Sequence, residues 1–313
     1  MKKPKIVVIG SSNTDMVVKS DRIPVPGETI TGGSFLLAQG GKGANQAVAA
    51  ARLGAEVLFV TRVGNDMFGR EAVEQYQREG IDTSFIEVDA TAATGVALIL
   101  VDAKGENLIS VASGANHALY PEQIDRASEA IGQADLVILQ LEIPLATVEY
   151  AVALCNKLGV PVILDPAPAP RVPLPDSVLK GIATIKPNET EASALTGMPV
   201  TDSESAEKSA QFLLDKGAKS VIITLGTQGV FAISACGERA FVPSFSVSAV
   251  DSTAAGDCFS AAYAVATVQG HSLSDAIRFA AAAAAISVTR IGAQGSLPTL
   301  AEVNEFLTQH SAF

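Results

Sequence analysis

Short apolar, β-branched runs alternate along this chain with stretches of helical periodicity. The runs that we expect to form strands are Lys5–Ile9, Glu56–Val63, Leu136–Leu139, Val160–Leu164, Ile182–Ile185 and Ser220–Thr224. The helices expected between them are Ala44–Leu53, Phe68–Glu79, Thr147–Leu158 and Ala206–Lys216. Unbroken apolar strands that alternate with helices are typical of a parallel sheet with helical crossovers. The pattern therefore predicts an α/β protein.

Two stretches depart from this rhythm. Val17–Leu37 and Thr94–Val111 each have the pattern of two antiparallel strands joined by a turn. We expect them to form a small β layer beside the main sheet, with lid segments at about residues 14–37 and 94–111. No flexible linker interrupts the chain, so we expect one domain over residues 1–313. Helices are expected in the last third, over Phe259–Gln269, Leu273–Arg290 and Leu300–Gln309.

Composition narrows the classes of function. The 313 residues include 22 Lys and Arg against 33 Asp and Glu, a formal net charge of −11. Nucleic acids and anionic membranes attract basic proteins, so neither is an expected partner. The longest uncharged run, Ser220–Gly237, is broken by turn residues, which argues against a membrane span. The first residues lack the apolar core of a signal peptide, and the three cysteines have no metal or disulfide spacing. We therefore expect a cytoplasmic protein.

Two familiar nucleotide-binding motifs are not found. The segment Gly41–Gln46 begins like a dinucleotide-binding loop but has Gln46 where a third glycine should pack the helix onto the sheet. A phosphate loop of the G-x-x-x-x-G-K-[ST] type is also lacking. These observations disfavour a nicotinamide oxidoreductase, and any phosphate must be held by another device.

The segment Asp251–Phe259 is the strongest candidate for a phosphate-binding element. Small residues run directly into a predicted helix, so free backbone N–H groups and the positive helix end can bind an anion. Asp257 lies in the first turn, where a carboxylate beside donated N–H groups suits phosphoryl transfer as the acceptor of a hydroxyl proton. The alternative is that Asp257 only caps the helix.

Other polar residues follow the carboxyl ends of predicted strands, where open α/β sheets bind ligands. Asn13 and Asp15 offer donors and acceptors for a polyol, although an Asx turn explains them as well. Lys42 lies at a helix start, where its charge opposes the helix dipole. A nearby anion or sugar hydroxyl would explain that position, and an exposed lysine on a tight turn is the alternative.

Three more strand ends carry candidate chemistry. Glu142 follows one strand, and Asn188 and Glu191 follow another. A carboxylate and an amide with water are enough for Mg²⁺, which keeps most of its own waters, but helix capping is equally compatible with each residue. The turn Thr224–Gly229 gives a nucleotide access to backbone groups, with an ordinary hairpin turn as the alternative.

Five motifs together resemble the ribokinase–fructokinase–adenosine kinase family of carbohydrate kinases over nearly the whole chain. They are GGKGANQAVAA at Gly40–Ala50, VDSTAAGDCF at Val250–Phe259, and the segments PNETEA, ITLGTQGV and TRIGAQGS. The Ala-Ala-Gly-Asp form of the second motif, PGET at Pro26–Thr29 and QLE at Gln140–Glu142 favour the ribokinase branch.

The resemblance implies a three-layer α/β/α sandwich with a mostly parallel central sheet and a small β-sheet lid. It also implies phosphorylation of the 5-hydroxyl of D-ribose by ATP, with Mg²⁺ and K⁺, in a homodimer formed through the lid. The implied base is Asp257, and the implied anion hole is formed by the amides of Ala255, Gly256 and Asp257. The implied sugar-binding residues are Asn13, Asp15, Gly41, Lys42, Asn45, Glu142 and Asp257.

The same resemblance implies two further groups of residues. Nucleotide positions fall on Asn188, Thr224, Gly226, Gly229 and Gly256, with Asn188 and Glu191 near Mg²⁺. The K⁺ site falls on Asp251, Thr253, Ser287, Arg290, Gly292 and Ser296. One departure is Ala281, where some relatives carry a polar residue near the base of ATP. The alternatives are a kinase for another sugar or a nucleoside, and a sugar-binding protein without catalysis, which an intact Asp257 disfavours.

Overall fold

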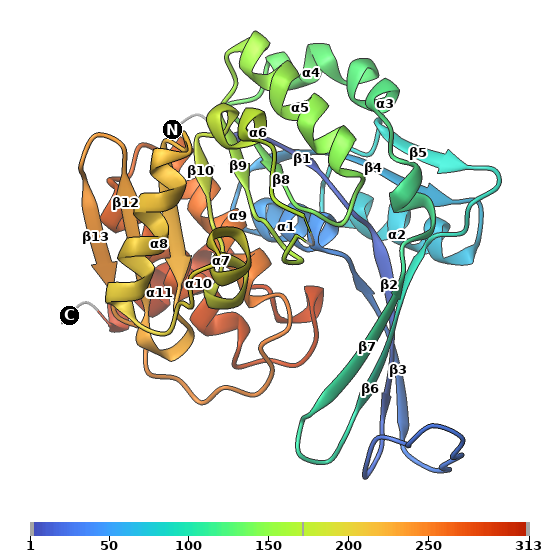
Figure 1. Cartoon of the computed structure of the whole chain (residues 1–313). Coiled ribbons are helices and arrows are strands. Elements are labelled where there is room, and N and C mark those ends of the chain that lie inside the picture. The colour runs from blue at the N-terminus through green and yellow to red at the C-terminus, as the bar shows by residue number, and fades with distance from the viewer. Residues whose placement is uncertain (1–2, 171, 311–313) are drawn as a thin grey trace.

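A nine-stranded sheet forms the centre of the protein (Figure 1). The computed structural model describes residues 3–170 and 172–310. Strand β12, the second from one edge, is antiparallel to both of its neighbours, and every other neighbouring pair is parallel. From edge to edge the strands are β13 (Arg239–Val242), β12 (Val230–Ser234), β11 (Ser220–Thr224), β10 (Thr184–Ile185), β9 (Val162–Leu164), β8 (Leu136–Leu139), β1 (Lys5–Ile9), β4 (Glu56–Gly64) and β5 (Ile86–Asp89).

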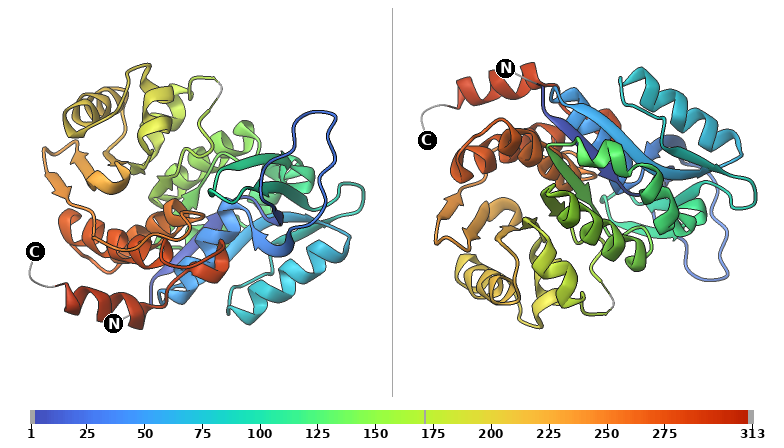
Figure 2. Two further views of the ribbon diagram at one scale, coloured as in Figure 1. Left: turned by 90° about the horizontal axis from the view of Figure 1, so that it is seen from below. Right: turned by 90° about the horizontal axis from the view of Figure 1, so that it is seen from above.

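Helices cover both faces of this sheet (Figure 2), which confirms the predicted three-layer sandwich. In β1, Ile6 and Val8 belong to one core and Val7 and Ile9 to the other, because alternate side chains of a strand point to opposite faces. One face is covered by α1 (Lys42–Arg52), α2 (Met67–Arg78), α9 (Ala255–Val268), α10 (Leu273–Ser287) and α11 (Leu300–Gln309). The other is covered by α3 (Pro121–Arg126), α4 (Ser128–Gly132), α5 (Leu145–Leu158), α6 (Asp176–Gly181), α7 (Glu189–Thr196) and α8 (Ser203–Asp215).

A second, four-stranded sheet projects from one end of the main body (Figure 1). Its order is β3 (Ser34–Gly40), β2 (Asn13–Lys19), β6 (Gly95–Val101) and β7 (Asn107–Ala112). The two antiparallel pairs agree with the sequence pattern, and a parallel pairing of β2 with β6 joins them. We call this sheet the lid.

Several helix boundaries differ from those predicted, and three of them lie near the candidate site. Helix α1 begins at Lys42 and α9 at Ala255, each a few residues earlier than the apolar pattern suggested, because their first turns carry polar or glycine residues. Helix α10 ends at Ser287, where hydroxyls of Ser287 and Thr289 donate to carbonyls of its last turn. Within the described ranges, none of the helices has the length and apolar character needed to cross a bilayer.

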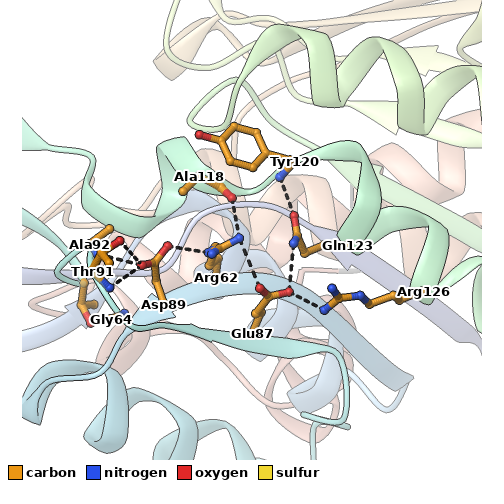
Figure 3. Close-up of polar contacts among 11 residues, drawn as sticks. Arg62, Gly64, Glu87, Asp89, Thr91, Ala92, Ala118, Tyr120, Gln123 and Arg126 are labelled. Atoms are coloured by element: carbon orange, nitrogen blue, oxygen red, sulfur yellow. Dashed lines mark hydrogen bonds and ion pairs between the residues drawn. The ribbon is translucent and has the colours of Figure 1, made fainter.

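A polar cluster lies where the chain leaves β5 for the lid and returns from it (Figure 3). Arg62 of β4 forms ion pairs with Asp89 at 2.8 Å and with Glu87 at 3.3 Å, and its Nη1 donates to the carbonyl of Ala118 at 3.0 Å. Asp89 precedes the lid strand β6, and Ala118 follows β7. One guanidinium therefore holds both ends of the β6–β7 hairpin. We call this group, with Gln123 and Arg126, the Arg62 cluster.

Candidate active site

The first turn of α9 provides free backbone donors. Ala254 precedes the helix with φ 61°, a left-handed conformation that turns the chain sharply into it. The amide of Ala255 donates to the carbonyl of Ser252 at 3.2 Å. The amides of Gly256 and Asp257 follow in the first turn, where a helix has no earlier carbonyl to offer them. Such a helix start binds anions.

Asp257 is a buried carboxylate at this helix start, 5% exposed. Its Oδ2 accepts from Asn45 Nδ2 at 2.9 Å, and its Oδ1 accepts from Gln46 Nε2 at 3.0 Å. Burial raises the pKa of Asp257, Lys42 lowers it and Asp165 raises it, and the net direction is upward. A carboxylate with a raised pKa is a better proton acceptor than an exposed one.

The predicted sugar-binding side chains lie around Asp257. Glu142 Oε2 accepts from Ser11 Oγ at 2.5 Å and from the backbone amide of Lys42 at 3.0 Å. Burial raises the pKa of Asp15 to about 7, and the negative charges of Glu142 and Asp257 raise it further. Burial lowers the pKa of Lys42, but the negative charges of Asp257, Glu142, Asp165 and Glu191 outweigh that effect and raise it. The lysine therefore stays charged among them.

Two glycine contacts explain how this group assembles. Gly41 has φ 90°, and a Cβ there would lie 2.7 Å from the backbone nitrogen of Asn13. A Cβ on Gly43 would lie 2.6 Å from the carbonyl carbon of Gly10. The start of α1 therefore packs backbone to backbone against the segment between β1 and β2. Asn13 is held there by Asn116, whose Nδ2 donates to Asn13 Oδ1 at 2.7 Å.

The predicted nucleotide positions form a second group at the ends of β10 and β11. Asn188 caps α7 through a reciprocal pair of hydrogen bonds with Glu191, so the capping geometry considered as an alternative is present. Thr224 lies beside Asn188, and its amide donates to the carbonyl of Pro187 at 3.1 Å. Gly226 and Gly229 have φ 51° and 113° in the turn between β11 and β12, which is the hairpin alternative. Neither geometry prevents backbone contacts with a nucleotide.

The available oxygen ligands suit an Mg²⁺ ion that keeps most of its water ligands. Within residues 3–170 and 172–310, no cluster of three or more His, Cys, Asp and Glu side chains could hold a metal ion directly. Mg²⁺ needs only one or two carboxylates beside phosphates and water. Burial raises the pKa of Glu191, as does Asp165, while Lys186 lowers it. A cation near Glu191 would therefore relieve a buried negative charge.

The predicted K⁺ residues lie on two segments that the structure brings together. Asp251 Oδ2 accepts from the amide of Gly292 at 2.9 Å, and its Oδ1 accepts from the amide and hydroxyl of Thr253. Burial would raise the pKa of Asp251, but these hydrogen bonds lower it. The guanidinium of Arg290 turns away to pair with Glu302 of α11, at 2.6 Å. Ser287 and Ser296 are buried, and their hydroxyls donate to local carbonyls.

Sequence reasoning missed a buried set of residues beneath Asp257. Gln46 bridges Asp257 and Asp165, and Asp165 pairs with Lys186 at 3.1 Å. Lys186 Nζ also donates to the carbonyl of Gly256 at 3.2 Å, which ties the nucleotide edge to the start of α9. The sequence did contain a signal for Asp165 and Lys186, because each of them directly follows an apolar strand. Gln46 lies inside a helix and gave no such signal.

Comparisons with known proteins agree with this geometry. The chain matches the pfkB family of carbohydrate kinases over residues 3–300. It is 48% identical to ribokinase of Haemophilus influenzae over 303 residues, which cover 96% of this chain and 98% of that protein. It is 40% identical to deoxyribokinase of Salmonella typhi, covering 97% and 98% of the two chains.

A solved structure gives the same result. Ribokinase of Arabidopsis thaliana, determined with ribose and ATP, is 36% identical and superimposes with a TM-score of 0.92 over 98% of this chain and 99% of that chain. The similarities extend over nearly the full length of each protein, and they include both the main sheet and the lid. The family resemblance seen in the sequence motifs is confirmed, and this chain belongs to the pfkB family of carbohydrate kinases.

Proposed function

We propose that the protein transfers the γ-phosphoryl group of ATP to the 5-hydroxyl of D-ribose. The observation that carries this proposal is Asp257, a buried carboxylate with both oxygens held, in the first turn of a helix whose free amides can receive a phosphoryl group. Support comes from the similar ribokinases of Haemophilus influenzae and Arabidopsis thaliana, the latter bound to ribose and ATP.

In the proposed reaction, Asp257 accepts the proton of the 5-hydroxyl as the oxygen bonds to the γ-phosphorus. The bond between that phosphorus and the β–γ bridging oxygen breaks, so the products are ribose 5-phosphate and ADP. The amides of Gly256 and Asp257, with Ala255 beside them, stabilise the negative charge on the transferred group. Asp257 afterwards releases its proton to water.

The sugar site in this proposal is the group packed around Asp257. Its carboxylates, amides and ammonium can each bond a sugar hydroxyl, which suits a polyol better than an apolar ligand. Its residues come from the lid strand β2, the start of α1, the segment after β8 and the first turn of α9. The proposed residues are Asn13, Asp15, Gly41, Lys42, Asn45, Glu142 and Asp257.

ATP would lie along the second group, with its phosphates toward Gly256. Asn188, Thr224, Gly226 and Gly229 offer side-chain and backbone contacts, and adenine would meet the half-buried Ala281. Asn188 and Glu191 would hold Mg²⁺ through water, where the ion would neutralise phosphate charge. Support for ATP comes from the similar ribokinase of Arabidopsis thaliana, which was solved with ribose and ATP.

A K⁺ ion would occupy the place where Asp251 meets Gly292. Asp251 would supply the counter-charge, Thr253, Ser287, Gly292 and Ser296 would supply oxygens, and Arg290 only its carbonyl, since its guanidinium is paired. We expect severalfold faster turnover in K⁺ than in a bulky organic cation at equal ionic strength, acting on kcat by ordering the anion hole. Equal rates, or an Asp251→Ala variant that keeps its K⁺ response, would exclude this site.

The test of the substrate is ADP release measured over ribose, 2-deoxyribose, fructose and adenosine. We expect ribose to have the highest kcat/KM. Deoxyribose is the second candidate, because a deoxyribokinase is also 40% identical to this chain. A severalfold preference for fructose or adenosine would contradict the sugar assignment and leave the family assignment intact.

Assembly and location complete the proposal. We propose a homodimer formed through the lid, because the lid exposes the large apolar side chains of Phe35, Leu98, Leu108, Ile109 and Val111. The chain is proposed to be a single kinase domain, since the family match spans residues 3–300. A cytoplasmic compartment agrees with three free cysteines.

A further inference from the structure

Gln46 is a buried glutamine that joins the proposed base to a second carboxylate. It lies on α1 and has no exposed surface. Its Nε2 donates to Asp257 Oδ1 at 3.0 Å and to Asp165 Oδ2 at 3.0 Å. A carboxamide nitrogen carries two hydrogens, so each carboxylate can receive one. Gln46 therefore bridges two buried acids without leaving either hydrogen unused.

The orientation of this amide is set by a third residue. Gln140, which is also fully buried, donates from its Nε2 to Gln46 Oε1 at 2.6 Å. The reversed amide of Gln46 would turn its oxygen toward two carboxylates and its NH₂ toward the NH₂ of Gln140. Both contacts would be repulsive, so the NH₂ of Gln46 has to face Asp257 and Asp165.

Asp165 is in turn anchored to the helix start. Its Oδ2 accepts from Ser260 Oγ at 2.8 Å and pairs with Lys186 Nζ at 3.1 Å. Lys186 also donates to the carbonyl of Gly256, and the single hydroxyl hydrogen of Ser260 can go to that carbonyl instead of to Asp165. In a planar trans peptide the carbonyl and the next N–H point in opposite directions, so these donors turn the Asp257 amide away from themselves.

We propose that Gln46 is a positioning residue for Asp257, which holds the carboxylate in its ionised, oriented form and couples it to the buried Asp165–Lys186 pair. The inference rests on the proposed role of Asp257 as the base. Asn45 and Gln46 each occupy one oxygen of Asp257, and each oxygen keeps a lone pair for a substrate hydroxyl. Loss of Gln46 would free the carboxylate to rotate and would favour its protonated form.

The charges around Asp257 would remain when Gln46 is changed. These charges come from each element that packs against Asp257. Because they stay constant, the loss of the hydrogen bond from Gln46 should by itself raise the pKa of the Asp257 carboxyl group. The charged groups are Lys42 of α1, Asp15 of β2, Asp165 after β9, Lys186 after β10, Glu142 after β8 and Glu191 of α7.

The test measures kcat against pH at saturating ribose and MgATP for wild type, Gln46→Met and Gln46→Glu. For Gln46→Met we expect kcat to fall roughly 10–100-fold, because the base is no longer aligned. The ribose KM should stay within about twofold, and the acid limb of the kcat profile should move up by about one pH unit. Gln46→Glu should move it further, because a third carboxyl group then faces Asp257 and Asp165.

The matched control is Gln123→Met in the Arg62 cluster. Gln123 is 7% exposed and donates to Glu87, so this substitution also removes a buried amide next to a carboxylate. We expect it to lower the free energy of unfolding and to leave the acid limb in place. A folded Gln46→Met protein with an unmoved acid limb would overturn the proposal. If Gln46→Met fails to fold, the same criterion applies to Gln46→Glu, which has the shape of glutamine.

Failure of the proposed function would give different results from failure of the role of Gln46 alone. Wild-type protein that does not phosphorylate ribose, or an Asp257→Asn variant with normal turnover, would remove Asp257 as the base. Normal wild-type turnover that is lost in Asp257→Asn, together with an unmoved acid limb in the Gln46 variants, would remove only the role of Gln46.

Discussion

Two polar networks in this protein use the same residue types in different surroundings. The first lies beneath α9, where Asp165 and Lys186 have side chains only 2% and 4% exposed. The second is the Arg62 cluster at the base of the lid, where Glu87 and Arg126 are 26% and 66% exposed (Figure 3). Each network contains acidic side chains in contact with a glutamine, with one lysine in the first and two arginines in the second.

The pKa of one aspartate in each network is shifted, and the two shifts have opposite directions. Asp89 of the Arg62 cluster accepts from the amides of Ala92 and Thr91 and from the Thr91 hydroxyl, and it also pairs with Arg62, so its pKa is lowered. Burial raises the pKa of Asp257, and two amide donors and Lys42 do not compensate for it. A carboxylate whose oxygens accept enough hydrogen bonds to lower its pKa has a structural role. A buried carboxylate with too few donors keeps a raised pKa and can act as a base.

The largest effect is expected where the reactive carboxylate is removed. We predict that Asp257→Asn lowers kcat by about 10²–10⁴-fold, because that is the usual contribution of a general base. Calorimetry should still detect binding of ATP and ribose. Near-normal turnover would contradict the assignment.

Breaking the buried ion pair should have the next largest effect. We predict that Lys186→Met lowers the free energy of unfolding by about 3–5 kcal/mol, because it leaves Asp165 buried without its cation. The double variant Lys186→Met/Asp165→Asn should recover much of this loss, because both charges are then gone. Urea unfolding measures both effects, and equal losses in the single and double variants would exclude a charge effect.

The third effect concerns Asp15. We predict that Asp15→Ala raises the ribose KM about 10–100-fold, because hydrogen bonds from sugar hydroxyls to a charged group are lost. In wild type, kcat/KM for ribose should increase as the pH rises through about 7, where Asp15 ionises. A pH-independent kcat/KM over that range would contradict this.

The raised pKa of Asp15 also predicts how the free energy of unfolding changes with pH. Its pKa rises from 3.8 to about 7 on folding, so the folded protein binds this proton more tightly than the unfolded chain. The free energy of unfolding should therefore fall as the pH rises from about 4 to 7. Asp15→Asn should reduce that fall, and the comparison needs only urea midpoints at both pH values.

The smallest effect is expected at the exposed end of the Arg62 cluster. We predict that Arg126→Ala changes the free energy of unfolding by less than about 0.5 kcal/mol, because exposed ion pairs contribute little. It should leave kcat and its pH profile unchanged. A loss as large as that of Lys186→Met would mean that burial does not distinguish the two networks.

Much of the fold could be predicted from local sequence. Apolar runs such as Leu136–Leu139 and Ser220–Thr224 coincide with strands β8 and β11, because a strand buried on both faces needs an unbroken apolar run. The two antiparallel pairs of the lid were also predictable. The parallel pairing of β2 with β6 was not, because its residues are far apart in the chain and neither strand encodes its partner.

The residues of the candidate site also divide into those that local sequence predicts and those that only the tertiary structure brings together. The sequence alone determined the α/β class, the family and the position of Asp257 near the start of a helix, because strand patterns, glycine turns and first-turn acids are local signals. Only the tertiary structure decided that Gln46, Asp165 and Lys186 lie beneath Asp257, and that Arg62 holds the two ends of the lid hairpin. These contacts join separate strands and helices, and the pKa of a buried acid depends on the charges and donors that packing places around it.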